Sequence, residues 1–506
     1  MNARFHPKSI QVATCLAALF AFASTTNPVM AKPEMTDQAI SDKVEDELLF
    51  DPGVVPTNLD VSTEDGIVTL TGKVGNILAK DRAARVAETV KGVRAVVDRI
   101  EVRPAAYRPD SEIQDQVEAA LLEDPATESY EITPRVENGR VTLAGTVDSY
   151  QERELVRTVA KGVRGVTSID DQIEVDYETN RVDAEIKQEI DHAMRWDAYI
   201  DSYLVRVRVN DGQVALSGVV GSAAEKRLAR NKAWVAGVKS VDASKLSVEK
   251  WARDEQLRVD KYPVKSSSDV KAAVEDAMLY DPRVVSFNVK VDMTGGSATL
   301  RGTVDNLRAK RAAEQDARNT VGVSYVSNRI KVRPGTHVGD VEIGEAIRNA
   351  FARDPYVERF ELTVTVLDGT VYLYGAVDSY FEKSRADLIA SGVAGVVDVQ
   401  NHLNVDNDVA NLYDPYIDDS FVKSDDLLKY EKRAPLKTDE ELEKAIESEL
   451  WWSPFVDSDE VTVAVDDGIA TLTGTVDTWG EYSAATENAY EGGATLVDND
   501  LDVTYD

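Results

Sequence analysis

Apolar residues recur at every fourth position in six separated stretches of the chain, and they alternate with polar residues in the segments that follow. A spacing of four puts side chains on one face of an α-helix, so each stretch predicts a helix with one stripe toward a core. The six stripes are Ile40, Val44 and Leu48; Ile113, Val117 and Leu121; Ile186, Ile190 and Met194; Val270, Val274 and Met278; Ile343, Ile347 and Phe351; and Leu442, Ile446 and Leu450. Five of these helices are expected to end at Asp-Pro or Ser-Pro, as at Asp51-Pro52, because proline disfavours α geometry in the residue before it.

A β-hairpin is predicted after each helix, most clearly where Tyr203 to Val209 alternate between polar and apolar residues. The turns are Asp65-Gly66, Asn138-Gly139, Asp211-Gly212, Gly295-Gly296, Asp368-Gly369 and Asp467-Gly468. Such pairs suit a type I′ turn, in which both central residues need positive φ. A Gly-x-Val motif begins seven residues after the first turn residue, at Gly72, Gly145, Gly218, Gly302, Gly375 and Gly474. The turn chemistry therefore sets the register of each hairpin.

A polar, alanine-rich segment such as Ala79 to Val90 predicts a second helix, and a strand such as Val96 to Val102 follows it. A right-handed crossover would make this third strand parallel to the second. The fold class predicted is therefore α+β, with six tandem α-β-β-α-β modules. Each module is a three-stranded mixed sheet covered on one face by two helices, with free edges and one open face for a neighbour or a ligand. In the sixth unit Gly492-Gly493 stands where the second helix should end, so that helix is expected to be short or frayed.

The Gly-x-Val glycines are spaced by 73, 73, 84, 73 and 99 residues, which defines a module of about 73 residues. Gly72 to Gly302 and Gly145 to Gly375 are both 230 residues, so a block of three modules is interpreted as having been copied once. The predicted boundaries are 36–103, 110–176, 183–249, 266–333, 340–406 and 438–506, with a linker at 407–437 that joins a five-module body to a movable sixth module.

Residues 1–31 have the pattern of a secretory signal peptide, because Arg4 and Lys8 precede an apolar run and small residues precede the expected cleavage after Ala31. A membrane anchor is the weaker alternative, since the run is short for a span. The single cysteine, Cys15, lies inside this segment. The exported chain would therefore contain no disulfide, thiolate metal site or cysteine nucleophile.

The formal charge of the chain is −33, and removal of Arg4 and Lys8 with the signal leaves 55 basic against 90 acidic residues, or −35. Such an acidic surface repels phosphate backbones, so nucleic acid is not expected as a partner. Electrostatic docking on anionic lipid is opposed as well. A membrane contact would need apolar anchors or bridging divalent cations.

Candidate catalytic chemistry is sparse. His192, His337 and His402 fall in different modules or boundaries, so they predict neither a catalytic triad nor a histidine metal site. Acidic groups such as Asp498-Asn499-Asp500 could bind calcium weakly, but they lack EF-hand spacing and are better explained as solvated surface. No catalytic residue, metal site or cofactor is predicted.

Large aromatic residues near the ends of two first helices are the candidate binding residues. Trp196 and Trp452 occupy the same place in the third and sixth units, Tyr199 and Phe455 follow three residues later, and Trp451 lies alongside Trp452. Aromatic residues with a polar atom suit a membrane interface or a protein hot spot. The alternative is that they fill gaps between helix and sheet.

The module order, the Asp-Pro after the first helix, the hairpin turn and the motif Gly145-Thr146-Val147-Asp148-Ser149 resemble the BON domain. The resemblance covers residues 36 to 506 apart from linkers. It implies attachment to phospholipid surfaces or envelope components in the periplasm, protection of the envelope under osmotic stress and no enzymatic activity. The motif residues that the resemblance implies are structural, namely glycines and apolar residues that make the fold, and they include no catalytic set.

Two functions are therefore predicted. The first is a non-enzymatic exported protein, periplasmic, secreted or associated with the outer membrane, whose modules bind phospholipid or envelope surfaces weakly and gain strength from multivalency. The second is a chaperone-like scaffold that holds client proteins along open sheet edges. An enzyme is a distant third, because it would require a pocket at a module junction with carboxylates of shifted pKa. Ligand identity and oligomeric state are not predicted.

Overall fold

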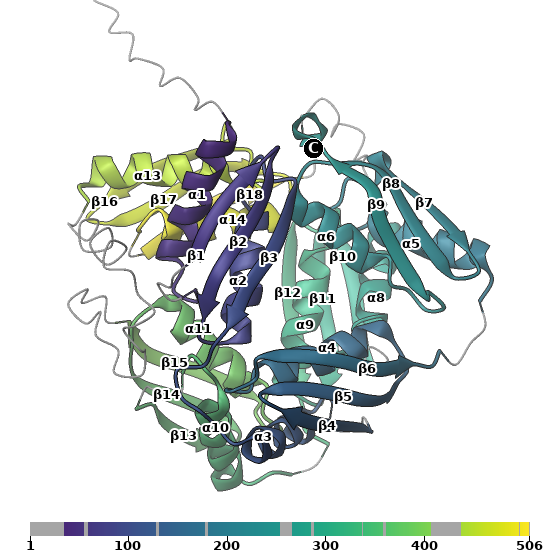
Figure 1. The fold of residues 1–506 in the computed structure, drawn as a ribbon, viewed down its shortest axis with the longest axis vertical. Helices are drawn as coiled ribbons and strands as arrows, with labels where there is room; N and C mark the ends of the chain where they lie inside the picture. Colours follow the sequence, from purple (N-terminus) through teal and green to yellow (C-terminus); the bar gives the residue numbers. More distant parts are fainter. Residues whose placement is uncertain are drawn as a thin grey trace, which may run out of the picture. The chain divides into compact units, whose positions relative to one another are not determined.

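The computed structural model describes residues 35–54, 59–127, 131–177, 181–253, 266–284, 288–335, 337–357, 361–405, 437–494 and 496–504. Within these ranges the chain forms twelve α-helices and six sheets, and residues 36–506 make one compact unit (Figure 1). The proposed signal peptide, and all but the last residue of the predicted linker 407–437, lie outside the described residues. None of the described helices is long and apolar enough to cross a membrane.

Each module has the predicted order of helix, two strands, helix and strand. The first module consists of α1 (Asp37–Phe50), β1 (Leu59–Glu64), β2 (Ile67–Val74), α2 (Ile77–Glu88) and β3 (Ala95–Val102). The second consists of α3 (Asp110–Glu123), β4 (Ile132–Glu137), β5 (Arg140–Val147), α4 (Tyr150–Lys161) and β6 (Ser168–Val175). The third consists of α5 (Asp183–Arg195), β7 (Val205–Asn210), β8 (Gln213–Val220), α6 (Ala223–Lys232) and β9 (Ser240–Val248), with short 3₁₀ helices η1 (Ser202–Leu204) and η2 (Lys250–Arg253).

The second half repeats this order. The fourth module consists of α8 (Ser267–Leu279), β10 (Val289–Thr294), β11 (Ser297–Val304), α9 (Leu307–Arg318) and β12 (Tyr325–Val332). The fifth consists of α10 (Asp340–Arg353), β13 (Thr363–Leu367), β14 (Thr370–Val377), α11 (Tyr380–Ser391) and β15 (Asp398–Val405). The sixth consists of α13 (Asp439–Trp452), β16 (Val461–Asp466), β17 (Ile469–Val476), α14 (Trp479–Glu491) and β18 (Leu496–Val503).

Every sheet is mixed, with its middle strand antiparallel to the first and parallel to the third (Figure 1). In the first module Glu64 pairs with Ile67 across the turn, and Val74 pairs with Val102 at the far end of the parallel ladder. The parallel third strand confirms the crossover that the strand–helix–strand order predicts. The six sheets remain separate within the described residues, so each module keeps two free strand edges.

The core of each module lies between its sheet and its two helices. In the second module a single cluster joins the α3 stripe, alternate residues of β5, Val156 and Ala160 of α4, and Ile173 of β6. All eighteen residues of the six predicted helix stripes are buried. The intervening middle-strand residues, such as Thr142, are only half-buried. The second to sixth modules each have a core cluster of their own, although Ile77 of the first module joins the cluster of the second and Leu307 of the fourth joins that of the fifth.

Backbone geometry explains the two glycine signals of the hairpin. Asp65 and Gly66 have φ of 52° and 73°, the positive values that a type I′ turn needs. Gly302 of the Gly-x-Val motif has φ of 136°, and a Cβ there would lie 1.9 Å from the carbonyl oxygen of Asn288. The turn glycine thus supplies a conformation, while the motif glycine also makes room for the neighbouring backbone.

The second helix of the sixth module differs from the prediction. Residues Trp479–Glu491 form thirteen residues of helix, no shorter than the second helices of the other modules. Thr478 caps its N-terminus by accepting a hydrogen bond from the Glu481 amide at 3.1 Å. The paired glycines Gly492 and Gly493 lie just after the helix and end it rather than fray it.

A carboxylate that the sequence analysis missed holds the hairpin turn in five modules. Asp37, at the first position of α1, accepts hydrogen bonds from the amides of Asp65 at 2.8 Å and Gly66 at 2.9 Å. Asp110, Asp183, Asp340 and Asp439 make the same pair of contacts. The fourth module has Ser267 at this position, and it alone has Gly-Gly as its turn.

Replacing Ser267 by Asp is expected to stabilise the fourth module by about 1 kcal/mol, because the new carboxylate can accept from both turn amides. The gain should appear as a higher urea midpoint with an unchanged slope. Ser268→Asp is the matched control, since it adds the same charge to the helix N-terminus one position further from the turn. Equal gains from both substitutions would mean that the helix dipole, rather than the turn contact, is responsible.

Candidate functional site

The five candidate aromatic residues lie at the ends of first helices and are not exposed. Trp451 and Trp452 are the last residues of α13, and Trp196 is the C-cap of α5. Trp452 is buried, whereas Trp451, Trp196, Tyr199 and Phe455 are half-buried. Burial raises the pKa of Tyr199 to about 12.

The tryptophan pair of the sixth module contacts the first module. The amide of Lys91 donates to the carbonyl oxygen of Trp452 at 2.9 Å, and Lys91 Nζ donates to the carbonyl oxygen of Trp451 at 2.9 Å. The Lys91 ammonium also lies 5.2 Å from the centre of the Trp451 ring, within the range of a cation–π interaction. The two indoles meet edge to face at 4.9 Å. One lysine of the first module thus holds the end of α13.

The same junction is formed a second time by the third and fourth modules. The Val321 amide donates to the carbonyl oxygen of Trp196 at 3.0 Å, and the Trp196 ring packs against the core of the fourth module. Val321 follows Lys91 by 230 residues, and Trp452 follows Trp196 by 256, which are the two offsets of the duplication. The copied blocks therefore repeat this backbone contact between modules three and four and between modules six and one. The Arg164 amide makes the equivalent contact between modules two and five, donating to the carbonyl oxygen of Arg353 at 2.8 Å.

Residues at equivalent positions of the two halves also contact each other. Tyr199 and Phe455 meet edge to face with ring centres 5.9 Å apart. Arg353 donates to Glu123 at 2.6 Å, and these two residues are separated by the 230-residue offset. Contacts between equivalent residues are the mark of a two-fold related interface. The two three-module halves are thus paired as the subunits of a symmetric dimer would be.

The structure therefore brings Tyr199 together with Phe455 and Trp451 together with Trp452, and it places Trp196 on the fourth module. They fill gaps, as the alternative interpretation holds, but the gaps lie between modules rather than between the helix and sheet of one module. A role for these residues as membrane or partner anchors stays a prediction.

A buried aspartate after the first helix was not recognised in the sequence as a contact residue. Asp354 has a side chain that is only 3% exposed, and it accepts hydrogen bonds from Arg385 Nε at 2.8 Å and from the Tyr356 amide at 2.9 Å. Asp124 at the equivalent position takes its cation, Arg308, from the fourth module. The Asp-Pro signal predicted only a helix end, whereas the aspartate also carries an ion pair within or between modules.

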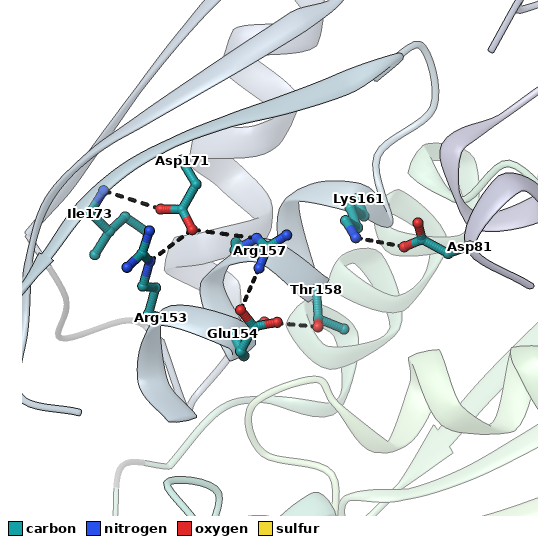
Figure 2. Close-up of polar contacts among 8 residues, drawn as sticks. All are labelled: Asp81, Arg153, Glu154, Arg157, Thr158, Lys161, Asp171 and Ile173. Carbon is teal, nitrogen blue, oxygen red and sulfur yellow. Dashed lines mark hydrogen bonds and ion pairs between the residues drawn. The ribbon is translucent and has the colours of Figure 1, made fainter. Parts of the chain in front are cut away.

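Charged side chains of α4 form ion pairs both within the second module and with the first module. Figure 2 shows Asp171 of β6 accepting from Arg153 Nε at 2.8 Å and from the Ile173 amide at 3.1 Å. At the end of the same helix, Lys161 Nζ lies 2.6 Å from a carboxylate oxygen of Asp81 in α2 (Figure 2). These charges join α4 to its own sheet and to the first module.

The second, third and fourth modules line an open cavity of about 1470 Å³. Asp316 lines it, and burial raises the pKa of this carboxyl well above its usual range, with a further contribution from the nearby Asp281 charge. Lys232 lies 2.7 Å from Asp197 and Arg283 is paired with Asp281, so most of the charges in the cavity wall are engaged in ion pairs. The cavity meets one condition set for an enzyme, a shifted carboxylate at a junction.

Of the three histidines, His192 lines this cavity, whereas His337 and His402 lie in or next to the fifth module. His192 is on α5, where its Nδ1 lies 3.9 Å from Asp276, and His402 is on β15, where it stacks on Tyr374 at 5.2 Å. His337 precedes α10. Among the described residues, the carboxylates close enough to share a cation are Glu47, Glu449 and Glu491, from two modules. No sequence motif could have joined these three, because Glu47 lies 402 residues before Glu449, and Glu491 follows 42 residues after Glu449.

Comparison with known proteins gives the family. The BON domain model matches residues 36–104, 109–177, 182–250, 266–334, 339–407 and 438–505. The chain is 33% identical over 141 residues to osmotically-inducible protein Y of Escherichia coli K12, a match that covers 27% of this chain and 70% of the relative. It is 27% identical over 165 residues to the outer membrane lipoprotein DolP of Haemophilus influenzae, covering 31% of this chain and 85% of that protein.

Among solved structures, the C-terminal domain of CdsD, a structural protein of the type III secretion system of Chlamydia trachomatis, is 18% identical. The match covers 45% of this chain and all of that domain, with a TM-score of 0.13. The six family matches span most of the chain and coincide with the six α-β-β-α-β modules of the structure. The chain belongs to the BON domain family.

Proposed function

We propose that this protein is a non-enzymatic component of the bacterial envelope, exported to the periplasm, that attaches to phospholipid or other envelope surfaces and supports the envelope under osmotic stress. The observation that carries the proposal is the row of six BON modules, together with relatives named for osmotic induction and for the outer membrane. Six weak sites on one chain would add up through effective concentration.

The acidity of the chain limits how such attachment can work. With a formal charge of −33, long-range electrostatics would repel anionic lipid, so apolar and aromatic contacts or bridging cations must supply the attraction. The aromatic residues at the first-helix ends are the proposed anchors, and Trp451 and Trp452 are the strongest candidates because two indoles lie together there.

Liposome co-sedimentation of the mature chain tests this proposal. Replacing both Trp451 and Trp452 by alanine is expected to lower the pelleted fraction several-fold, since about 1.5–3 kcal/mol of apolar burial per large side chain would be lost at the lipid surface. Trp251→Ala is the control, because Trp251 is 50% exposed on η2 and lies outside the candidate set. Circular dichroism should show that the double variant remains folded.

Equal pelleting of the double variant and the parent would count against these two residues as anchors. If the parent pellets with no lipid composition at any calcium concentration, the proposal of lipid attachment fails.

A second function is supported by the separate sheets. In each three-stranded sheet of the described chain, both outer strands have one edge without a partner strand. A client peptide in an extended conformation could add a strand at such an edge. A chaperone-like scaffold would suppress aggregation of unfolded outer-membrane proteins at stoichiometric ratios. Absence of suppression at those ratios would eliminate this alternative.

A further inference from the structure

The junction between the first and sixth modules contains a group of facing carboxylates. Glu47 of α1, Glu449 of α13 and Glu491 at the end of α14 place carboxylate oxygens within 4.8 Å of one another. The side chains of Glu47 and Glu449 are only 15% and 17% exposed, whereas Glu491 lies at the more open edge of the group. Three acids from two modules are therefore held together only when the modules are docked.

Few cations face this group. Lys43 of α1 is paired with both Glu47, at 2.6 Å, and Glu449. Glu487 of α14 and Asp51 after α1 also act on Glu491. Arg82 of α2 is paired with Asp51, and Lys437 Nζ donates to the carbonyl oxygen of Gly492, next to Glu491, at 2.6 Å. The titratable and charged groups that lie here are thus Glu47, Asp51, Glu449, Glu487 and Glu491 against Lys43, Arg82 and Lys437.

Protons would relieve this excess of negative charge. Burial, followed by the Glu449 charge, raises the pKa of Glu47 well above its usual range. Burial is also the main reason why the pKa of Glu491 rises from 4.5 to about 7. A carboxyl whose pKa is higher in the docked state binds its proton more tightly there. Docking is then strongest at acidic pH, and it weakens as the pH rises from about 4.5 to about 7.

The equivalent junction between the third and fourth modules has no such group. The positions of Lys43 and Glu47 are occupied there by Ala273 and Ala277, and those of Glu449 and Glu491 by Ala193 and Val235. The buried acid near that junction, Asp316, is a single carboxyl beside two ion pairs. The junction is repeated, and among the described residues the three facing glutamates occur where the last module closes on the first and not at the other copies.

We propose that the junction of the first and sixth modules is a pH-controlled closure. It is docked while Glu47 or Glu491 holds a proton, and it opens when both are ionised beside Glu449, whereas the junction of the third and fourth modules stays docked. Opening moves α13 away from Lys91 and so uncovers Trp451 and Trp452, which Lys91 contacts in the docked state. The link between opening and lipid attachment rests on the proposed function; the opening itself does not.

Energy transfer between two dyes on the full mature chain tests the closure. The mature chain has no cysteine, so Gln38→Cys on α1 and Ser448→Cys on α13, both exposed, can be labelled selectively. In the presence of a chelator, the ratio of docked to open molecules is expected to fall about tenfold between pH 5 and pH 8. The whole pKa shift of Glu491 would change this ratio more, but the partial exposure of its side chain reduces the change. A reference pair at the other junction, Ser268→Cys with Gln188→Cys, should give constant transfer.

Variants separate the cluster from general titration of an acidic chain. Glu47→Gln keeps the size of the side chain and removes one charge, so it should keep the sixth module docked at pH 8 and flatten the pH profile. Glu447→Gln, exposed on α13 and outside the group, should leave the profile unchanged.

Constant transfer of the parent from pH 5 to pH 8, or equal effects of the two variants, would overturn the proposal. If calcium without a change of pH restores docking at pH 8, the group binds a cation and proton control is wrong. Liposome pelleting measured at both pH values distinguishes the closure from lipid attachment. Pelleting without any change in energy transfer supports lipid attachment and contradicts the closure. A change in energy transfer without pelleting supports the closure and contradicts lipid attachment.

Discussion

Gly302→Ala is expected to unfold the fourth module, at a cost of about 3–5 kcal/mol, whereas a substitution seven residues earlier in the same hairpin should be tolerated. Gly302 has φ of 136°, and its missing Cβ would lie 1.9 Å from the carbonyl oxygen of Asn288 and 3.0 Å from its carbonyl carbon. Both atoms belong to the backbone of Asn288, just before β10, where Val289 pairs with Gly302. The clash can therefore be relieved only if the paired strands β10 and β11 move apart. Urea unfolding followed by hydrogen exchange in β10 and β11 would show the loss.

Gly295→Asn is the matched control. Gly295 also has positive φ, 51°, but a Cβ there would meet nothing within 4 Å. Asparagine tolerates this left-handed conformation, and four of the other five turns have aspartate with nearly the same φ. The control should therefore be neutral or stabilising by up to about 1 kcal/mol, because it reduces the freedom of the unfolded chain. A loss below about 1 kcal/mol for Gly302→Ala would show that the backbone yields easily, contrary to this argument.

The hairpins and helices could be predicted because the forces that specify them act over a few residues. Asp65-Gly66 carries its own preference for positive φ, and Ile40, Val44 and Leu48 share a helix face whatever the rest of the chain does. Repetition strengthened these signals, since six copies in the same phase leave little room for an alternative register. The predicted module order and mixed sheet were confirmed for the same reason.

Contacts over longer separations were missed even where they recur. Asp37 lies 28 residues before the turn whose amides it binds, and the same spacing occurs in five modules, so comparison of the repeats could have found it. The contacts between modules left weaker signals in the sequence than this repeated contact within a module. Trp196 and Trp452 were recognised as equivalent, but nothing periodic links them to Val321 and Lys91, because docking of two folded surfaces depends on shape and on charges that neither segment reveals alone.

Asp354→Ala is the second substitution with a large expected effect, a loss of about 3–5 kcal/mol, because it would leave the half-buried Arg385 guanidinium without its counter-ion. It also removes the acceptor of the Tyr356 amide at 2.9 Å and of the Val357 amide at 3.3 Å. Asp398→Ala on the exposed face of β15 is the control and should change stability by less than about 0.5 kcal/mol. Urea unfolding of the full chain measures both.

Adding Arg385→Met to Asp354→Ala decides which loss matters. If the unpaired cation is the main penalty, the double variant should recover more than half of the stability, since an apolar side chain can occupy the space of the ion pair without a desolvation cost. No recovery would instead assign the effect to the two backbone amides. Tyr356 Oη donates to the carbonyl oxygen of Gly53 in the first module at 2.8 Å, so the turn that Asp354 shapes also holds a junction. Loss of Asp354 should therefore weaken the contact between modules one and five together with the fold of module five.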